Sequence, residues 1–93
     1  MENKNDKLLI QFKEDIQKKY GQKILYSKDC QNLLLHLQAK TNREVSITTL
    51  KRFFGVIKSP FTPGKYTLDT FANYLNYEKW QDYIRHIITV RTK

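Results

Sequence analysis

The chain has 93 residues, which is enough for one hydrophobic core but not for two. Lysine and arginine number 17 against 9 aspartate and glutamate, giving a formal net charge of +8, and 13% of the residues are aromatic. The aromatic content excludes a disordered basic tail, and the scarcity of glycine and proline argues against a many-turned β-sandwich or barrel. We therefore expect one all-α domain over residues 1–93, a compact bundle of about five short helices.

The first two helices are predicted from apolar residues that recur every three or four positions. The stripe of the first helix consists of Leu8, Leu9, Phe12 and Ile16, and that of the second of Cys30, Leu33, Leu34 and Leu37. Gly21 is placed to end the first helix, because glycine readily adopts the left-handed conformation found there. Ser27 is expected to cap the second helix, since its hydroxyl can accept a hydrogen bond from a free amide. This helix should run to about Ala39 or Lys40.

A third helix is predicted over residues 46–54, after a polar turn at 41–45 in which Asn42 can supply a left-handed residue. Ser46 is the expected N-cap. Val45 is expected to pack on Leu50, which sets the angle at which the chain enters the helix. Gly55 then ends it. The expected buried face comprises Ile47, Leu50, Phe53 and Phe54.

The longest loop is expected at residues 56–66. Residues 62–65 fit a type II turn, and residues 56–57 and 65–66 are predicted to pair as a small hairpin. Thr67 is the expected N-cap of a fourth helix that ends at Asn76, a residue tolerant of the left-handed conformation. That helix has a stripe of Leu68, Phe71, Ala72 and Leu75.

A fifth helix is predicted to begin near Glu78, with an apolar side of Trp80, Tyr83, Ile84, Ile87 and Ile88. Leu50 and Trp80 should both be largely buried, because each anchors an apolar stripe. The stripe of the fifth helix continues close to the last residue. This pattern has two interpretations: the chain is the N-terminal domain of a longer protein, or it ends naturally there with a frayed last helical turn.

The residues that enzymes and metal sites need do not occur in a recognisable pattern. Cys30 is the only cysteine and lies on an apolar stripe, which excludes a disulfide framework within the chain and a cysteine-based zinc site. His36 and His86 are far apart in sequence, with no carboxylate at ligand spacing. We therefore expect no enzyme activity, no catalytic residue, no metal site and no small-molecule cofactor. No apolar run suits a membrane span or an export signal, so a cytoplasmic location is expected.

The positive charge is concentrated at mid-chain. Residues 40–65 contain six basic residues and one acidic residue, Glu44. Such a local excess on a folded domain is the electrostatic footprint expected for a polyanionic partner. A solvated lysine-rich surface would explain the charge equally well.

Residues 45–55 have the form V-S-x-x-T-L-x-R-x-x-G. This segment resembles the recognition helix of helix-turn-helix regulators of the lambda-repressor and Cro class, and it is also similar to the S-x-x-x-L-x-R-x-F helix of AraC-type regulators. The helix that precedes it is in the place of the first helix of such a motif. The resemblance implies a transcriptional regulator that inserts the helix over residues 46–54 into the major groove of double-stranded DNA.

A second resemblance covers residues 67–83. They are similar to a T-L-x-x-L-A-x-Y-L-G-Y-x-S-W-x-D-F stretch in N-terminal regions of uncharacterised Bacteroidetes proteins, which also carry a T-L-x-R-F-F-G like that of residues 49–55. Asn76 and Glu78 stand where that stretch commonly has Gly and Ser. This resemblance implies a bacterial lineage and a domain type, and it brings no established activity.

The residues themselves point to DNA independently of either resemblance. On the outer face of the third predicted helix, Arg52 is suited to guanine and Thr48 to a thymine methyl or a phosphate. The full set of candidate DNA contacts is Thr48, Thr49, Lys51, Arg52, Lys40, Arg43, Lys58 and Lys65.

The alternative function is a helical protein-interaction domain, either an adaptor or a dimerisation module. Four tyrosines exceed what one core needs and would suit an exposed interface with a protein partner or a second copy. They are Tyr26, Tyr66, Tyr74 and Tyr77.

Overall fold

The expectation of an all-α fold is confirmed by the computed structural model, which describes residues 4–91. Five helices are present, and the described residues contain no strand. Their bounds are α1 Lys4–Tyr20, α2 Ser27–Thr41, α3 Ile47–Phe53, α4 Lys65–Tyr74 and α5 Trp80–Arg91. None of these helices has the length and apolar character needed to cross a lipid bilayer.

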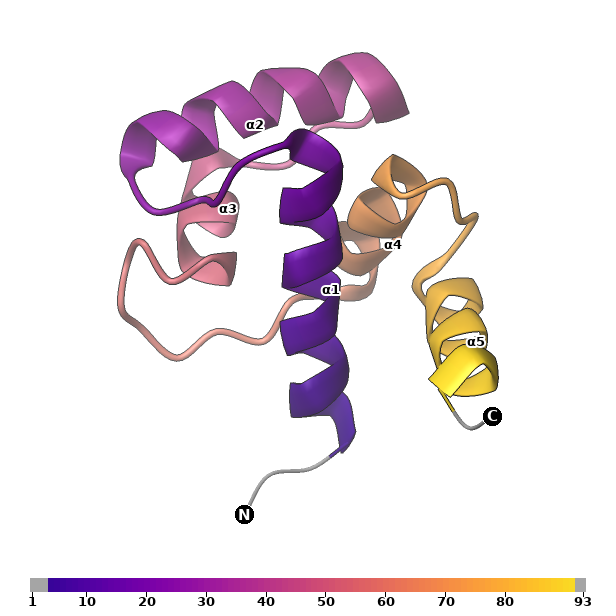
Figure 1. Ribbon diagram of the computed structural model, residues 1–93. Helices are drawn as coiled ribbons and strands as arrows, with labels where there is room; N and C mark the ends of the chain where they lie inside the picture. The colour runs from indigo at the N-terminus through magenta and orange to yellow at the C-terminus, as the bar shows by residue number, and fades with distance from the viewer. Residues whose placement is uncertain (1–3, 92–93) are drawn as a thin grey trace.

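The helices are arranged around α1, which runs through the middle of the view in Figure 1. In this view α2 lies across one end of α1, α3 lies to one side of it, and α4 and α5 lie to the other. Helix α2 packs on both α3 and α4, and α4 packs on α5. This arrangement places α3 and α5 on opposite sides of the molecule (Figure 1).

The core is built around the ring of Phe12 on α1. Its centroid lies 4.6 Å from those of Trp80 and Tyr83, 6.2 Å from Phe71 and 6.3 Å from Phe53. One aromatic side chain therefore joins four helices, and the tilted and edge-to-face contacts are those that aromatic rings favour. The buried apolar residues include Ile16, Cys30, Leu33, Leu37, Leu50 and Ala72, all from the predicted stripes.

Helix α2 begins one residue earlier than its sequence predicted. Its N-cap is Tyr26, and Ser27 is already helical, so the prediction of Ser27 as the cap is wrong. The cause is Asp29, whose Oδ2 accepts hydrogen bonds from the backbone amides of Tyr26 at 2.9 Å and Leu25 at 3.0 Å. At the other end Asn42 adopts the left-handed conformation, with φ of 58°, as predicted.

The predicted ends of α3 are confirmed. Ser46 is the N-cap, and its Oγ accepts a hydrogen bond from the Thr49 amide at 3.0 Å. Val45 and Leu50 both belong to the core, as expected for residues that flank such a cap. Gly55 follows the helix with φ of 78°, a conformation that favours glycine.

The segment between α3 and α4 differs from its prediction. Residues 65–66 belong to α4, so the hairpin is wrong. Gly64 has φ of −78° and is the N-cap of α4, which also makes the type II turn and the Thr67 cap wrong. Pro63 is buried and anchors the chain immediately before the helix. The Gly64 carbonyl accepts a hydrogen bond from the Leu68 amide at 3.0 Å, so the first turn of α4 starts before Thr67.

Helix α5 begins at Trp80, two residues after the predicted start, because it is capped from another helix. Oδ1 of Asp69 on α4 accepts a hydrogen bond from the Trp80 amide at 2.9 Å. Asn76, which follows α4, has φ of 74°, as predicted. Leu50 is fully buried, and Trp80 packs against the core with a minor part of its surface exposed, so both are largely buried as expected.

The four tyrosines expected on the surface divide into two pairs. Tyr26 and Tyr66 are 70% and 54% exposed. Tyr74 is fully buried and Tyr77 packs against the core, so the prediction is wrong for these two. The Tyr74 hydroxyl hydrogen-bonds with Nδ1 of His36 at 2.8 Å, which satisfies a polar atom that burial would otherwise leave unpaired.

Candidate functional site

The candidate site is the outer face of α3. Leu50 and Phe53 point into the core, and the Phe53 ring stacks on Phe71 with centroids 4.6 Å apart. On the opposite face Thr48 and Arg52 are both exposed. They are four residues apart, so they lie next to each other on successive turns of the helix. The structure therefore brings together the two residues predicted to read base edges.

The ends of α3 are held as firmly as its inner face. The Ser46 cap closes the first turn of α3. After its last turn, the Ile57 amide donates a hydrogen bond to the Lys51 carbonyl at 3.1 Å. Because α3 has only seven residues, these contacts and the buried Leu50 determine how its outer face is presented.

Thr49 has a different place from the one predicted for it. Its hydroxyl accepts a hydrogen bond from the Ser46 hydroxyl at 2.8 Å, and its amide donates to the same Ser46 oxygen. The side chain is half-buried within the cap rather than on the exposed face. Thr49 thus supports the helix end, and Thr48 is the threonine that the surface presents.

Three basic side chains accompany Arg52 close to α3. Lys51 is half-buried on the side of α2, near enough to Cys30 for its charge to act on that thiol. Lys58 is exposed in the loop that follows the helix. Lys13 of α1 places its ammonium 5.3 Å from the centroid of the Phe53 ring. Sequence analysis missed Lys13, and no local signal could have revealed it, because only the packing of α1 on α3 brings it there.

The other predicted DNA contacts lie in different surroundings. Lys40 is next to Lys19 of α1, and this neighbour, with burial as a smaller cause, lowers the pKa of Lys19. Arg43 lies over the Tyr66 ring, 5.4 Å from its centroid. Lys65 lines a depression between α4 and α5. The basic segment predicted at mid-chain is therefore divided among several parts of the surface.

The cations around α3 have no acidic partner among the described side chains. Among the side chains that the structure describes, one ion pair forms, between Arg85 and Asp82 of α5 at 3.6 Å. Arg52, Lys51 and Lys58 are therefore available to an external anion. An arginine that is both exposed and unpaired retains all of its N–H donors for a ligand.

Of the titratable residues that could support chemistry, Cys30 is buried, and the two histidines are exposed but contact tyrosines of the fold. Burial raises the pKa of the Cys30 thiol, an effect that the charge of Lys51 partly offsets. His36 is bonded to Tyr74, and the His86 ring packs 5.6 Å from that of Tyr77. Within the described part of the chain, no three His, Cys, Asp or Glu side chains come together as a metal site would require.

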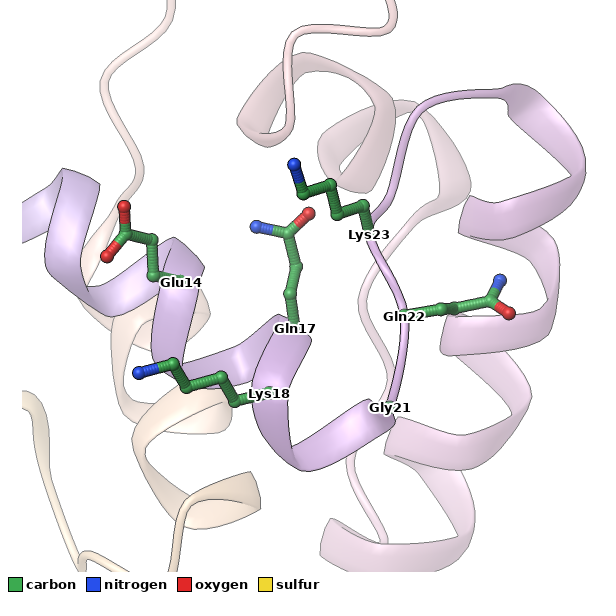
Figure 2. Close-up of a pocket in the computed structure, with 6 residues that line it drawn as sticks. All are labelled: Glu14, Gln17, Lys18, Gly21, Gln22 and Lys23. Atoms are coloured by element: carbon green, nitrogen blue, oxygen red, sulfur yellow. The ribbon is translucent and has the colours of Figure 1, made fainter.

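A separate open depression of about 510 Å³ lies where α1 ends (Figure 2). Its lining consists of Glu14, Gln17, Lys18, Gly21, Gln22 and Lys23. Figure 2 shows Gln22 directed away from Glu14, Gln17 and Lys23, and its amide reaches Asp29 of α2 at 3.2 Å. Oε1 of Gln17 accepts a hydrogen bond from the Ile24 amide at 2.7 Å. The amide groups here hold the segment between α1 and α2 in place, and the lining charges are mixed in sign.

No protein-family model matches the chain, and it matches no curated protein and no solved structure.

Proposed function

We propose that this protein binds double-stranded DNA through α3 and acts as a transcriptional regulator. The observation that carries the proposal is the pair formed by Thr48 and Arg52. Both are exposed on adjacent turns of a short helix whose other face is locked into the core, and Arg52 has no acidic partner among the described side chains. A short helix with a polar, cationic outer face has the size and chemistry that the major groove accepts.

The proposed contacts follow from the position of each side chain. Arg52 donates two hydrogen bonds to a guanine edge, and Thr48 meets a thymine methyl or a phosphate. Lys51 and Lys58, which are close to this pair in the chain, and Lys13, which reaches α3 from α1, bind phosphates, and these contacts position the protein without reading sequence. The arrangement of α2, the turn at residues 42–46 and α3 supports this assignment, because the first helix of a helix-turn-helix packs on the second in the same order.

Fluorescence anisotropy on labelled duplex pools at several salt concentrations tests the proposal. We expect binding that weakens steeply with salt. Arg52→Ala should reduce affinity for a selected site by about 1–3 kcal/mol and relax preference at one base position, whereas Lys58→Ala should weaken binding to all sequences alike. Lys23→Ala, at an exposed lysine near the end of α1, is the matched control. If the wild-type domain binds no duplex even at low salt, the proposal fails.

A protein-interaction domain is the second candidate. It is favoured by large apolar side chains that the structure leaves mostly exposed, among them Leu25, Tyr26 and Leu35. Exposed aromatic and aliphatic side chains are typical of protein interfaces. Sedimentation of the free domain over a range of concentrations tests whether a second copy covers them, and a monomer at all concentrations would exclude dimerisation.

A further inference from the structure

A depression of about 260 Å³ lies between the beginning of α4 and the beginning of α5. Residues 65–69 of α4 form one side of it and residues 79–81 the other. Its lining consists of Lys65, Leu68, Asp69, Lys79, Trp80 and Gln81. The two helices that line it, α4 and α5, lie across α1 from α3 (Figure 1).

The depression has an apolar wall made by Trp80 and Leu68. The Trp80 ring packs on Phe12 at 4.6 Å and stacks on Tyr83 at 5.5 Å with an interplanar angle of 19°. These contacts hold the indole in one orientation while part of it stays open to the depression. Leu68 is likewise only partly buried. A rigid, partly exposed indole offers a surface on which another aromatic ring can stack.

The rim of the depression is positively charged. Lys65 and Lys79 are exposed on opposite sides of it, and neither forms an ion pair with a described residue. Asp69 also lines the depression, but its Oδ1 already accepts the Trp80 amide at the start of α5. A carboxylate at that position is stabilised by the helix dipole. The lining thus carries two positive charges against one negative charge, and this excess of one positive charge favours an anionic ligand group.

We propose that this depression binds an acidic segment of a partner protein that carries an aromatic side chain. The aromatic side chain stacks on Trp80 and Leu68, and flanking carboxylates accept hydrogen bonds from Lys65 and Lys79. The volume is smaller than the pockets that hold drug-sized ligands, and it suits one side chain rather than a whole cofactor. This site does not depend on DNA binding by α3.

The probe is a capped peptide with one phenylalanine between glutamates, and the readout is the emission of Trp80, the only tryptophan of the chain. We expect a saturable shift of the emission to shorter wavelength as the peptide ring covers the indole. Replacing the phenylalanine of the peptide by alanine, or its glutamates by glutamines, should abolish the shift. An unchanged emission with the first peptide, or an equal shift with either control peptide, would overturn the proposal.

Charge reversals locate the binding. Lys65→Glu and Lys79→Glu should each weaken peptide association about three- to tenfold. Both place an acidic residue at or just before the start of a helix, where the dipole favours it, so both variants should stay folded. Lys23→Glu, which makes the same charge change elsewhere, should leave association within about twofold of the wild type. An equal loss in all three variants, or displacement of the peptide by duplex DNA, would contradict a site of this specificity.

Discussion

Truncation of Leu50 to alanine is the sharpest test of how α3 is oriented. Leu50 is fully buried in the core cluster, on the face of α3 opposite Thr48 and Arg52. The change removes three carbon atoms, which costs about 2.4 kcal/mol at about 0.8 kcal/mol per buried carbon, before any cavity is counted. Because residues of other helices surround the site, incomplete collapse should bring the total to about 3–4 kcal/mol.

Thermal and urea unfolding followed by circular dichroism measure this loss. For a domain of this size, about 3 kcal/mol corresponds to a fall of the melting temperature by about 12 °C or more. Thr48→Ala, at an exposed position on the same helix, is the control and should change stability by less than about 0.5 kcal/mol. An unchanged melting temperature for Leu50→Ala would mean that α3 does not insert this face into the core, and the proposed DNA-binding face would then be wrong as well.

Three further predictions concern the cap, the outer face and the buried thiol. Ser46→Ala should lower the free energy of unfolding by about 1 kcal/mol in urea titrations, because it leaves the Thr49 amide without its acceptor. The double replacement of Lys51 and Arg52 by alanine should leave that free energy nearly unchanged while removing duplex binding, and a large loss of stability would show that the two side chains support the fold. Burial raises the pKa of Cys30 in the folded state, so its contribution to stability is complete below the ordinary thiol value and declines as the pH rises through the folded value. Cys30→Ala should therefore show a weaker loss of stability at alkaline pH than the wild type, and identical pH profiles would contradict this.

The sequence predicted those features of the fold that neighbouring residues determine. Ser46 and Gly55 bound α3 as expected, because a capping hydroxyl and a left-handed glycine act within one turn. The start of α5 could not be predicted in this way. Its cap is Asp69, which is 11 residues away in sequence and reaches Trp80 only because α4 packs on α5.

The same distinction applies to the candidate site. The exposure of Thr48 and Arg52 follows from helical periodicity once Leu50 is placed inside, and the structure agrees. The grouping of the remaining cations depends on which helices pack together. Lys40 was predicted to flank α3 and lies beside Lys19, whereas Lys13 of α1, absent from the prediction, lies over Phe53 at the end of α3.

This distribution of charge limits how strongly the DNA affinity of one copy of the domain can depend on salt concentration. The chain has a net charge of +8, but the cations on or next to α3 are Lys13, Lys51, Arg52 and Lys58. If these four alone displace counterions, the logarithm of the association constant should fall with the logarithm of the salt concentration with a slope of about 3 to 4. Full use of the predicted mid-chain cluster, with Lys40, Arg43 and Lys65 added, would give a slope of about 6. Anisotropy titrations at three or more salt concentrations distinguish the two values, and a slope near the higher one would refute the division of the basic segment between separate surfaces.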